Sequence, residues 1–173
     1  TVLDLEQDAG NVFAVGSFTQ VNGVSAPYGL RLSKTTAAAS GWSIRPNNTI
    51  NTVFLDSSGR IVLGGSFLNF NNNIRTHLLK YDVASKALLP YNLNLNNSIR
   101  ALELDGNSLY IGGSFTTVDG QVRNRAAALD ATNASVLAFD PNVNNRIDEL
   151  FIRNGILYLG GSFTSVSGQT RTS

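Results

Sequence analysis

One phrase recurs four times along this chain of 173 residues and constrains its fold more than any other feature. Each copy joins a short apolar run to Gly-Ser-Phe and a polar turn, and the copies are residues 14–23, 63–72, 109–120 and 159–168. Their phenylalanines, Phe18, Phe67, Phe115 and Phe163, are 49, 48 and 48 residues apart by subtraction. A period of about 40 to 50 residues built from short strands is typical of propeller blades.

Alternating or near-continuous apolar runs flank the phrase and predict four short strands in a full copy. We expect first strands over residues 2–5, 52–55, 101–104 and 149–152, and second strands over 12–15, 61–63, 109–111 and 156–159. Third strands are expected over 28–32, 78–81 and 126–129, and fourth strands over 41–44, 88–91 and 136–139. The turn after each phenylalanine calls for positive φ at Gly23, Asn72, Gly120 and Gly168.

Four hairpin-connected strands per copy, without helical periodicity, predict an all-β protein made of β-propeller blades of four antiparallel strands. Three complete blades are expected, at residues 1–49, 50–98 and 99–146, and residues 147–173 form the first half of a fourth. We expect them all to belong to one propeller domain. Closed propellers need about four to eight whole blades, and the chain does not begin with methionine. We therefore expect a segment of a larger propeller; assembly of several copies, or cover by another polypeptide, are the alternatives.

The Gly-Gly-Ser-Phe phrase predicts blade packing. Paired glycines fit a bend in the backbone or a close approach by another segment, and the phenylalanine is expected to fill the space between neighbouring blades. No Lys-Ser/Thr follows the glycines, and no helix N-terminus is expected beside them. The phrase is therefore not a phosphate-binding loop.

Composition narrows the classes of function. The net charge is +1 and the basic residues are scattered, which argues against a nucleic-acid partner. No apolar run approaches the roughly 18 residues of a membrane-spanning helix, so membrane insertion is not expected. Cysteine and methionine are both absent, which removes disulfides and thiolate sites. Together with abundant Ser, Thr and Asn, their absence favours an extracellular or cell-surface setting.

The third copy shows a family resemblance in its apolar and glycine positions and in Arg123, Ala127, Leu129 and Asp130. It resembles the bacterial delta-60 β-propeller repeat, Leu-Tyr-x-Gly-Gly-x-Phe-Thr-x-Val-x-Gly followed by Arg-x-x-x-Ala-x-Leu-Asp. The resemblance spans essentially the whole chain, with its main departures at Val15, Ala26, Phe70 and Asn72. It implies a propeller fold within a large secreted or surface-attached bacterial protein, and it implies no shared catalytic residues.

Two sets of residues are candidates for ligand contact. Arg75, Arg123 and Arg171 each lie eight residues after the phenylalanine and would present guanidinium groups to an acidic or phosphorylated ligand. The structural alternative, which we favour, is that they pair with Asp82 or Asp130 and cap turn carbonyls. The aromatic residues of the expected fourth strands, Trp42, Tyr91 and Phe139, would suit stacking on sugars, although packing between blades is the favoured interpretation.

The remaining polar residues are interpreted as structural. His77, the single histidine, lies in the expected third strand without a nucleophile motif nearby, and is predicted to be a surface or strand residue. Calcium is an alternative for the repeated aspartates, but none lies in an Asp-x-Asp-x-Asp-Gly loop, and turn hydrogen bonding explains them. These are Asp56, Asp82, Asp105 and Asp130. The sequons at Asn47, Asn96 and Asn133 are interpreted as turns. No catalytic, cofactor or metal site is expected.

We therefore expect a non-enzymatic β-propeller module that acts as a structural scaffold or as an adhesion and interaction unit of a large bacterial surface protein or assembly. Its expected partners are other blades or chains of the same protein, with a surface glycan or protein as a further partner. The alternatives are a carbohydrate-binding module, or a propeller lyase or glycosidase whose active residues lie at the channel mouth or outside this segment.

Overall fold

The computed structural model describes residues 1–40 and 44–171, and in this part of the chain it consists of strands, turns and loops without a helix. The chain divides into two compact units, Thr1–Pro90 and Tyr91–Ser173. The prediction of an all-β protein built from antiparallel blades is confirmed.

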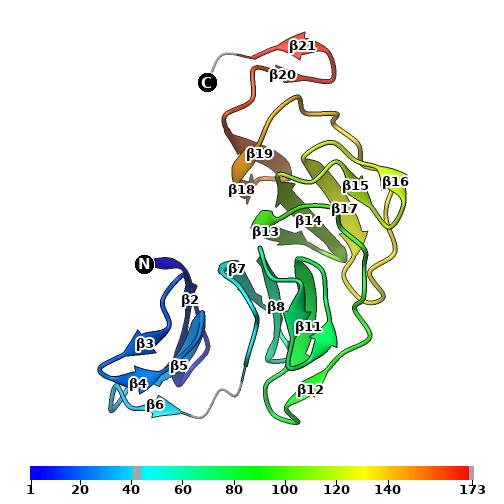
Figure 1. Ribbon diagram of the computed structural model, residues 1–173. Coiled ribbons are helices and arrows are strands. Elements are labelled where there is room, and N and C mark those ends of the chain that lie inside the picture. Colours follow the sequence, from blue (N-terminus) through cyan, green and yellow to red (C-terminus); the bar gives the residue numbers. More distant parts are fainter. Residues whose placement is uncertain (41–43, 172–173) are drawn as a thin grey trace. The chain divides into compact units, whose positions relative to one another are not determined.

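The first unit holds two four-stranded antiparallel sheets, and in each the strands lie in chain order from one edge to the other (Figure 1). The first sheet consists of β1 (Val2–Gln7), β2 (Asn11–Gly16), β5 (Gly29–Ser33) and β6 (Ala39–Ser40). The second consists of β7 (Ile50–Leu55), β8 (Arg60–Gly65), β11 (Leu78–Asp82) and β12 (Ala87–Leu88). These sheets are the first two predicted blades.

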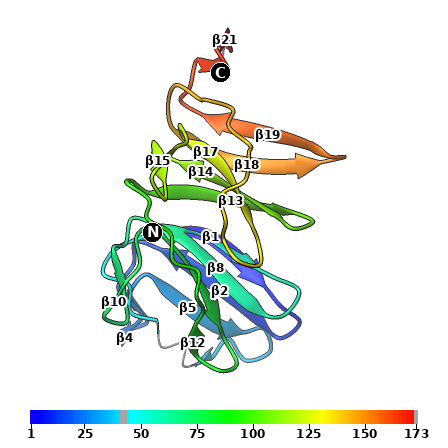
Figure 2. The same ribbon diagram turned by 90° about the vertical axis from the view of Figure 1, so that its right-hand side faces the viewer.

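The second unit holds a three-stranded and a two-stranded sheet, which Figure 2 shows stacked on one another. The first consists of β13 (Ile99–Asp105), β14 (Ser108–Gly113) and β17 (Ala126–Asp130), and the second of β18 (Ile147–Arg153) and β19 (Ile156–Gly161). The fourth strand of the third blade is reduced to one bridge between Leu129 and Val136.

The fourth strands lie earlier than predicted. In the first blade the fourth strand is β6, which ends before the expected range 41–44. In the second blade it is β12, which overlaps the expected range 88–91 only at Leu88. The reason is that the turn after the third strand is shorter than the sequence suggested. Residues 41–43, including Trp42, lie outside the described residues. The apolar residues assigned to the fourth strand, such as Ile44 and Tyr91, follow the strand and are buried.

Each copy also contains a short hairpin after its phenylalanine, where only a turn was predicted. The pairs are β3 (Gln20–Val21) with β4 (Val24–Ser25), β9 (Asn69–Phe70) with β10 (Asn73–Ile74), β15 (Thr117–Val118) with β16 (Gln121–Val122), and β20 (Ser165–Val166) with β21 (Gln169–Thr170). Both loop residues of each hairpin have positive φ, for example 48° at Asp119 and 78° at Gly120, which is the type I′ geometry that suits two-residue loops. The predicted positive φ at Gly23, Asn72, Gly120 and Gly168 is confirmed.

The second glycine of each phrase is required by a bulge in the hairpin of the first two strands. The register shifts near the start of β1, β7, β13 and β18, and the carbonyl that precedes the bulge then lies directly over the glycine. A Cβ on Gly113 would lie 2.2 Å from the oxygen of Ser98, which accepts a hydrogen bond from Ser114 N at 2.9 Å. A side chain has no space at this position.

Neighbouring sheets pack through apolar clusters within each unit. In the first unit Val15 of the first blade shares a cluster with Ile50 and Phe67 of the second blade. In the second unit Phe163 packs against a cluster that contains Ala101 and Ala126 of the third blade. The prediction that the phenylalanine fills the space between neighbouring blades is confirmed for these two residues.

Carboxylates join the first strands of neighbouring blades. Asp4 Oδ2 accepts hydrogen bonds from Val53 N at 2.8 Å and from Thr52 Oγ1 at 2.9 Å. Glu103 Oε1 accepts one from Ile152 N at 3.1 Å. The first strand is the edge of its sheet, so its outward amides have no strand beside them, and the carboxylate of the preceding blade satisfies one of these amides. These contacts between blades were not predicted from the sequence.

We expect Gly113→Ala to lower the free energy of unfolding by about 1–3 kcal/mol, the usual effect of forcing a methyl group into a packed site. Urea unfolding followed by far-UV circular dichroism measures the change. Gly10→Ala is the control, because the nearest atom to a Cβ on Gly10 is Asp8 Oδ1 at 3.9 Å. Equal stability of the Gly113 variant and the wild type would contradict the close approach.

Candidate functional site

The polar residues that recur from one copy to another are the candidates for a site, and asparagine pairs in the links between blades are the most regular of them. Asn47, Asn96 and Asn144 lie in these links. Asn96 Oδ1 accepts hydrogen bonds from Thr116 N at 2.9 Å and Thr117 N at 3.1 Å, and its Nδ2 donates to Thr116 Oγ1 at 2.7 Å. Asn47 and Asn144 bind two successive amides in the same way.

These asparagines hold the short hairpin of one copy against the link that leads into it. The residues just before them form bridges to the hairpins, between Pro46 and Phe70, Leu95 and Val118, and Val143 and Val166. The sequons of Asn47 and Asn96 predict only turn residues, and Asn144 has no sequon. These asparagines recur with the same period as the phenylalanines, and this period is the sequence signal that could have identified their structural role.

The candidate arginines point to backbone carbonyls. Nη1 of Arg75, Arg123 and Arg171 donates to the carbonyl of the preceding residue at 2.7, 2.8 and 2.9 Å. Nη2 of Arg123 also donates to Leu137 O at 3.0 Å. The predicted capping of carbonyls is confirmed, but the predicted pairing with Asp82 or Asp130 is wrong. Those carboxylates lie at a different turn, where they accept bonds from neighbouring amides.

Three of the four repeated aspartates organise turns as predicted. Asp82 Oδ1 accepts hydrogen bonds from Ala84 N and Ser85 N at 3.0 and 2.9 Å. Asp130 Oδ1 accepts from Thr132 N and Asn133 N, and its Oδ2 accepts from Asn107 Nδ2 at 2.7 Å. Amide donors thereby lower the pKa of both carboxyls. The fourth aspartate, Asp105, is exposed at the end of β13.

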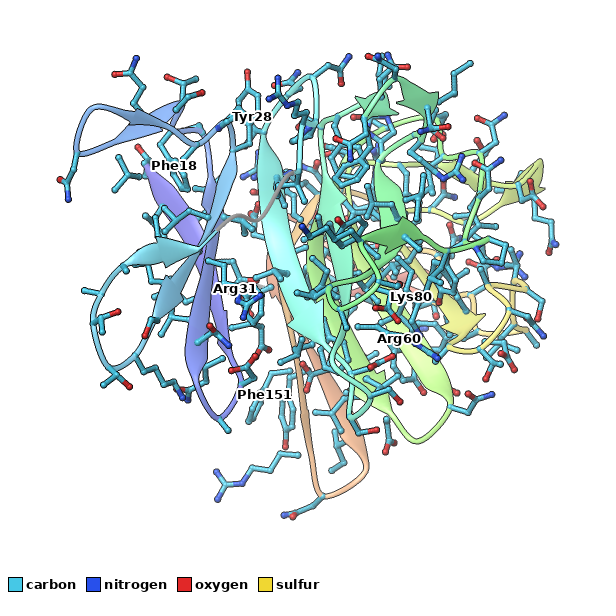
Figure 3. The ribbon with its side chains drawn as sticks, turned by 90° about the horizontal axis from the view of Figure 1, so that it is seen from below. Phe18, Tyr28, Arg31, Arg60, Lys80 and Phe151 are labelled. Atoms are coloured by element: carbon cyan, nitrogen blue, oxygen red, sulfur yellow. The ribbon has the colours of Figure 1, made fainter. Side chains whose placement is uncertain are left out.

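Asp56 combines a turn with a partly buried ion pair. Its Oδ1 accepts hydrogen bonds from Ser58 N and Arg60 N at 2.9 and 3.0 Å, and its Oδ2 lies 3.0 Å from Nζ of Lys80. The side chains of Lys80 and Arg60 lie near each other in Figure 3. Burial of Asp56 disfavours its charged form, but the amide donors and the ammonium group outweigh that effect and lower its pKa.

His77 lies at a repeated left-handed position. The residue ten places after the phenylalanine, just before the third strand, has φ of 64° at Tyr28, 68° at His77 and 67° at Arg125. Its amide donates to the phenylalanine carbonyl, as from Tyr28 N to Phe18 O at 2.8 Å. The equivalents of His77 are therefore Tyr28 and Arg125.

The imidazole of His77 is buried, contrary to the prediction of a surface or strand residue. His77 is 8 % exposed, and its Nδ1 lies 3.0 Å from Gly65 O. Because a carbonyl only accepts hydrogen bonds, Nδ1 carries the proton and acts as the donor. Burial lowers the pKa of His77, which favours the neutral ring.

The described aromatic candidates belong to the core. Tyr91 is 2 % exposed, its hydroxyl donates to Asp130 O at 3.3 Å, and burial raises its pKa. Phe139 makes an edge-to-face contact with Tyr110, with ring centroids 5.2 Å apart. For both residues the interpretation as packing is confirmed. Trp42, the third aromatic candidate, lies outside the described residues.

Clusters of metal ligands and membrane-spanning helices are both absent from residues 1–40 and 44–171. No three His, Asp or Glu side chains of these residues gather closely enough to hold a metal ion. The same residues contain no helix with the length and apolar character needed to cross a membrane.

Comparisons with known proteins agree with the blade architecture. Residues 57–83 match the model of a family described as a domain of unknown function (DUF5122), beta-propeller. No curated protein matches the chain. The computationally designed Ika4 protein is similar in structure, with 12 % identity, a TM-score of 0.61, and cover of 96 % of this chain and 89 % of that chain.

Two larger structures are similar as well. The WD40 repeats of RRP9 have 10 % identity and a TM-score of 0.59, over 86 % of this chain and 41 % of that chain. The designed Ika8 protein has 12 % identity and a TM-score of 0.59, over 98 % of this chain and 47 % of that chain. The chain therefore spans less than half the length of these two proteins, and at such low identity the likeness shows the fold alone.

We expect Asn96→Ala to lower the free energy of unfolding by about 1–2 kcal/mol, because two amides lose their acceptor. Asn96→Asp retains the acceptor oxygen and is expected to lose less. Urea unfolding of the two variants and the wild type measures the difference. If Asn96→Ala were as stable as Asn96→Asp, the amide cap would not contribute to stability.

A second prediction concerns the stability of the fold at acidic pH. Because the pKa of Asp56 is lowered from its usual 3.8, its ion pair stabilises the fold above that value and the contribution is lost as the pH falls through the lowered pKa. Asp56→Asn should therefore be less stable than the wild type near neutral pH, and the difference should shrink between about pH 4 and pH 2. Thermal unfolding across this range tests it, with Asp119→Asn, at an exposed turn, as the control. A difference independent of pH would contradict it.

Proposed function

We propose that this chain is a non-enzymatic β-propeller repeat module of the delta-60 kind, which acts as a structural scaffold or adhesion unit of a large secreted or cell-surface bacterial protein. One observation carries the proposal: the asparagines and arginines that recur with the second, third and fourth copies form their hydrogen bonds mainly with the backbone of the fold. A binding or catalytic site needs polar groups that converge on a ligand instead.

The asparagines supply the clearest support. Asn47, Asn96 and Asn144 each use their side-chain oxygen on two amides of the next hairpin. The repeated arginines likewise use Nη1 on a neighbouring carbonyl. Groups used in this way contribute to a rigid scaffold and have fewer hydrogen bonds left for a substrate.

The proposed setting rests on composition. A chain without cysteine or methionine has no thiol or thioether for oxidants to attack. The fold is secured by hydrogen bonds and apolar packing, so it does not depend on disulfides for its stability. Both properties suit a protein outside the cell, and the resemblance to delta-60 repeats points to the same setting.

Two other functions are distinguished by experiment. A glycan-binding module would use exposed aromatic rings, whereas the described candidates Tyr91 and Phe139 are packed against the fold. A propeller lyase or glycosidase would use acids at a channel mouth, and Asp105 is the repeated aspartate most exposed to solvent. Substitution of Trp42 therefore tests the glycan-binding module, and substitution of Asp105 tests the enzyme.

We expect the purified chain to show no turnover on a panel of polysaccharides and no binding on a glycan array. We also expect an antibody raised against it to label intact source cells or their secreted fraction, because a surface scaffold is accessible without lysis. Chromatography of the digested polysaccharides, array fluorescence and flow cytometry are the measurements.

If turnover or glycan binding is observed, two variants show which alternative function it supports. Turnover that disappears in Asp105→Ala would replace the scaffold by an enzyme, and array binding that disappears in Trp42→Ala would replace it by a glycan-binding module. Labelling restricted to lysed cells would remove the proposed setting. Val122→Ala, at an exposed apolar site on β16, is the control for each assay.

A further inference from the structure

Two apolar sheet faces are uncovered in the structure. We define the leading face as Val2 and Leu5 of β1, which are 51 % and 58 % exposed. We define the trailing face as Phe151, Ile156 and Tyr158 of β18 and β19, which are 54 %, 56 % and 52 % exposed, together with Gly160. Phe151 and Tyr158 pair across the two strands with their rings 6.4 Å apart, and Phe151 is labelled in Figure 3.

The blades inside each unit show what a leading face binds. Val2 pairs with Gly16 in the way that Ile50 pairs with Gly65 and Ile147 pairs with Gly161. Ile50 and Ile147, at this position in the second and fourth blades, are fully buried, because β7 packs on β1 and β2 and β18 packs on β13 and β14. Val53 in the second blade and Leu150 in the fourth are equivalent to Leu5, and both are also buried. The leading face thus has the composition of a surface that packs on the blade before it.

The blades also show which side chain of the next blade packs on a trailing face. A Cβ on Gly112 would lie 2.7 Å from Cγ2 of Ile147, so the missing side chain of Gly112 forms a recess that the isoleucine of the next blade fills. Gly160 is its equivalent, since it pairs with Glu149 as Gly112 pairs with Ala101. The nearest atom to a Cβ on Gly160 is Glu149 Cβ at 3.5 Å. The recess at Gly160 therefore lacks the aliphatic side chain that fills the one at Gly112.

Apolar residues beside each recess complete the match. Tyr110, two residues before Gly112, packs against the cluster that contains Ile147 and Leu150 of the next blade. Tyr158 occupies the same place before Gly160 and is half exposed. A following blade with an aliphatic residue at the position of Ile147 would cover both Tyr158 and Gly160. Val2 of the leading face is such a residue.

We propose that the leading face of one copy of this chain docks on the trailing face of a second copy, with Val2 entering the recess at Gly160. The contact continues the blade interfaces found within each unit, and it is a head-to-tail contact because the two faces differ. Two trailing faces would instead place recess against recess, without the aliphatic residue of the first strand that fills the recess at Gly112. The inference rests on the blade architecture and does not use the proposed cellular setting.

Sedimentation velocity of the 173-residue chain over a range of concentrations tests the proposal. We expect species of at least twice the monomer mass, with a share that rises with concentration. Leu5→Asp and Tyr158→Asp each place a charge on one face and should each sediment as a monomer. Ile74→Asp is the matched control, because Ile74 is 73 % exposed on β10, outside both faces, and this variant should associate like the wild type. A wild-type monomer at every concentration would overturn the proposal.

Mixing the two variants identifies which faces meet. Leu5→Asp keeps an intact trailing face and Tyr158→Asp keeps an intact leading face, so an equimolar mixture should recover a dimer through one restored interface. Contact between two trailing faces would leave Leu5→Asp associated on its own and is excluded by the expected result. A mixture that stays monomeric would overturn the head-to-tail contact.

Circular dichroism separates a lost contact from a misfolded variant, and the functional assays separate this proposal from the proposed function. Far-UV circular dichroism establishes that each variant is folded, and Val2→Lys and Ile156→Lys replace any variant that is not. Gly160→Val is a poor test, since Val15 occupies this position in the first blade and still packs beside Ile50. Glycan turnover or intracellular labelling would overturn the proposed function and leave the sedimentation result unchanged.

Discussion

The contact between a carbonyl and a glycine Cα at the start of each blade is the constraint on which the other features depend. The bulge near residue 99 brings Ser98 O over Gly113, and Ser114 N donates to the same oxygen. The chain can then leave the sheet and enter the short hairpin directly after the phenylalanine. The phenylalanine is consequently placed against the blade before it, as Phe67 and Phe163 are.

Short strands leave many amides beyond the ends of the ladders, and side chains satisfy them. Asn96 binds two amides of a hairpin, Asp130 binds two amides of a turn, and Asp4 binds an edge amide of the next blade. A buried or half-buried amide without a partner is costly. The polar side chains therefore help to define the blade together with the apolar core, which explains why so much polar sequence recurs.

The sequence was sufficient for the fold class and for the positive φ at Gly23 and Gly120, because these depend on the local pattern and on steric limits at single residues. It was not sufficient for partners that lie about 20 residues or a whole blade away. Asn96 was interpreted as a turn residue because its bonds to Thr116 and Thr117 depend on tertiary structure. The burial of His77 was missed for the same reason, since its left-handed backbone is fixed by bonds to Phe67 and Gly65.

Every strand pair within the described residues joins segments of a single copy, and the asparagine caps span only about 20 residues. Loop closure during folding is therefore short for the strand pairs and the asparagine caps, which favours rapid folding of a β protein. Such a chain can begin to fold at any blade and extend to the next, as in other repeat proteins. Its folding order is then set by the relative stability of the individual blades and does not depend on their order along the chain.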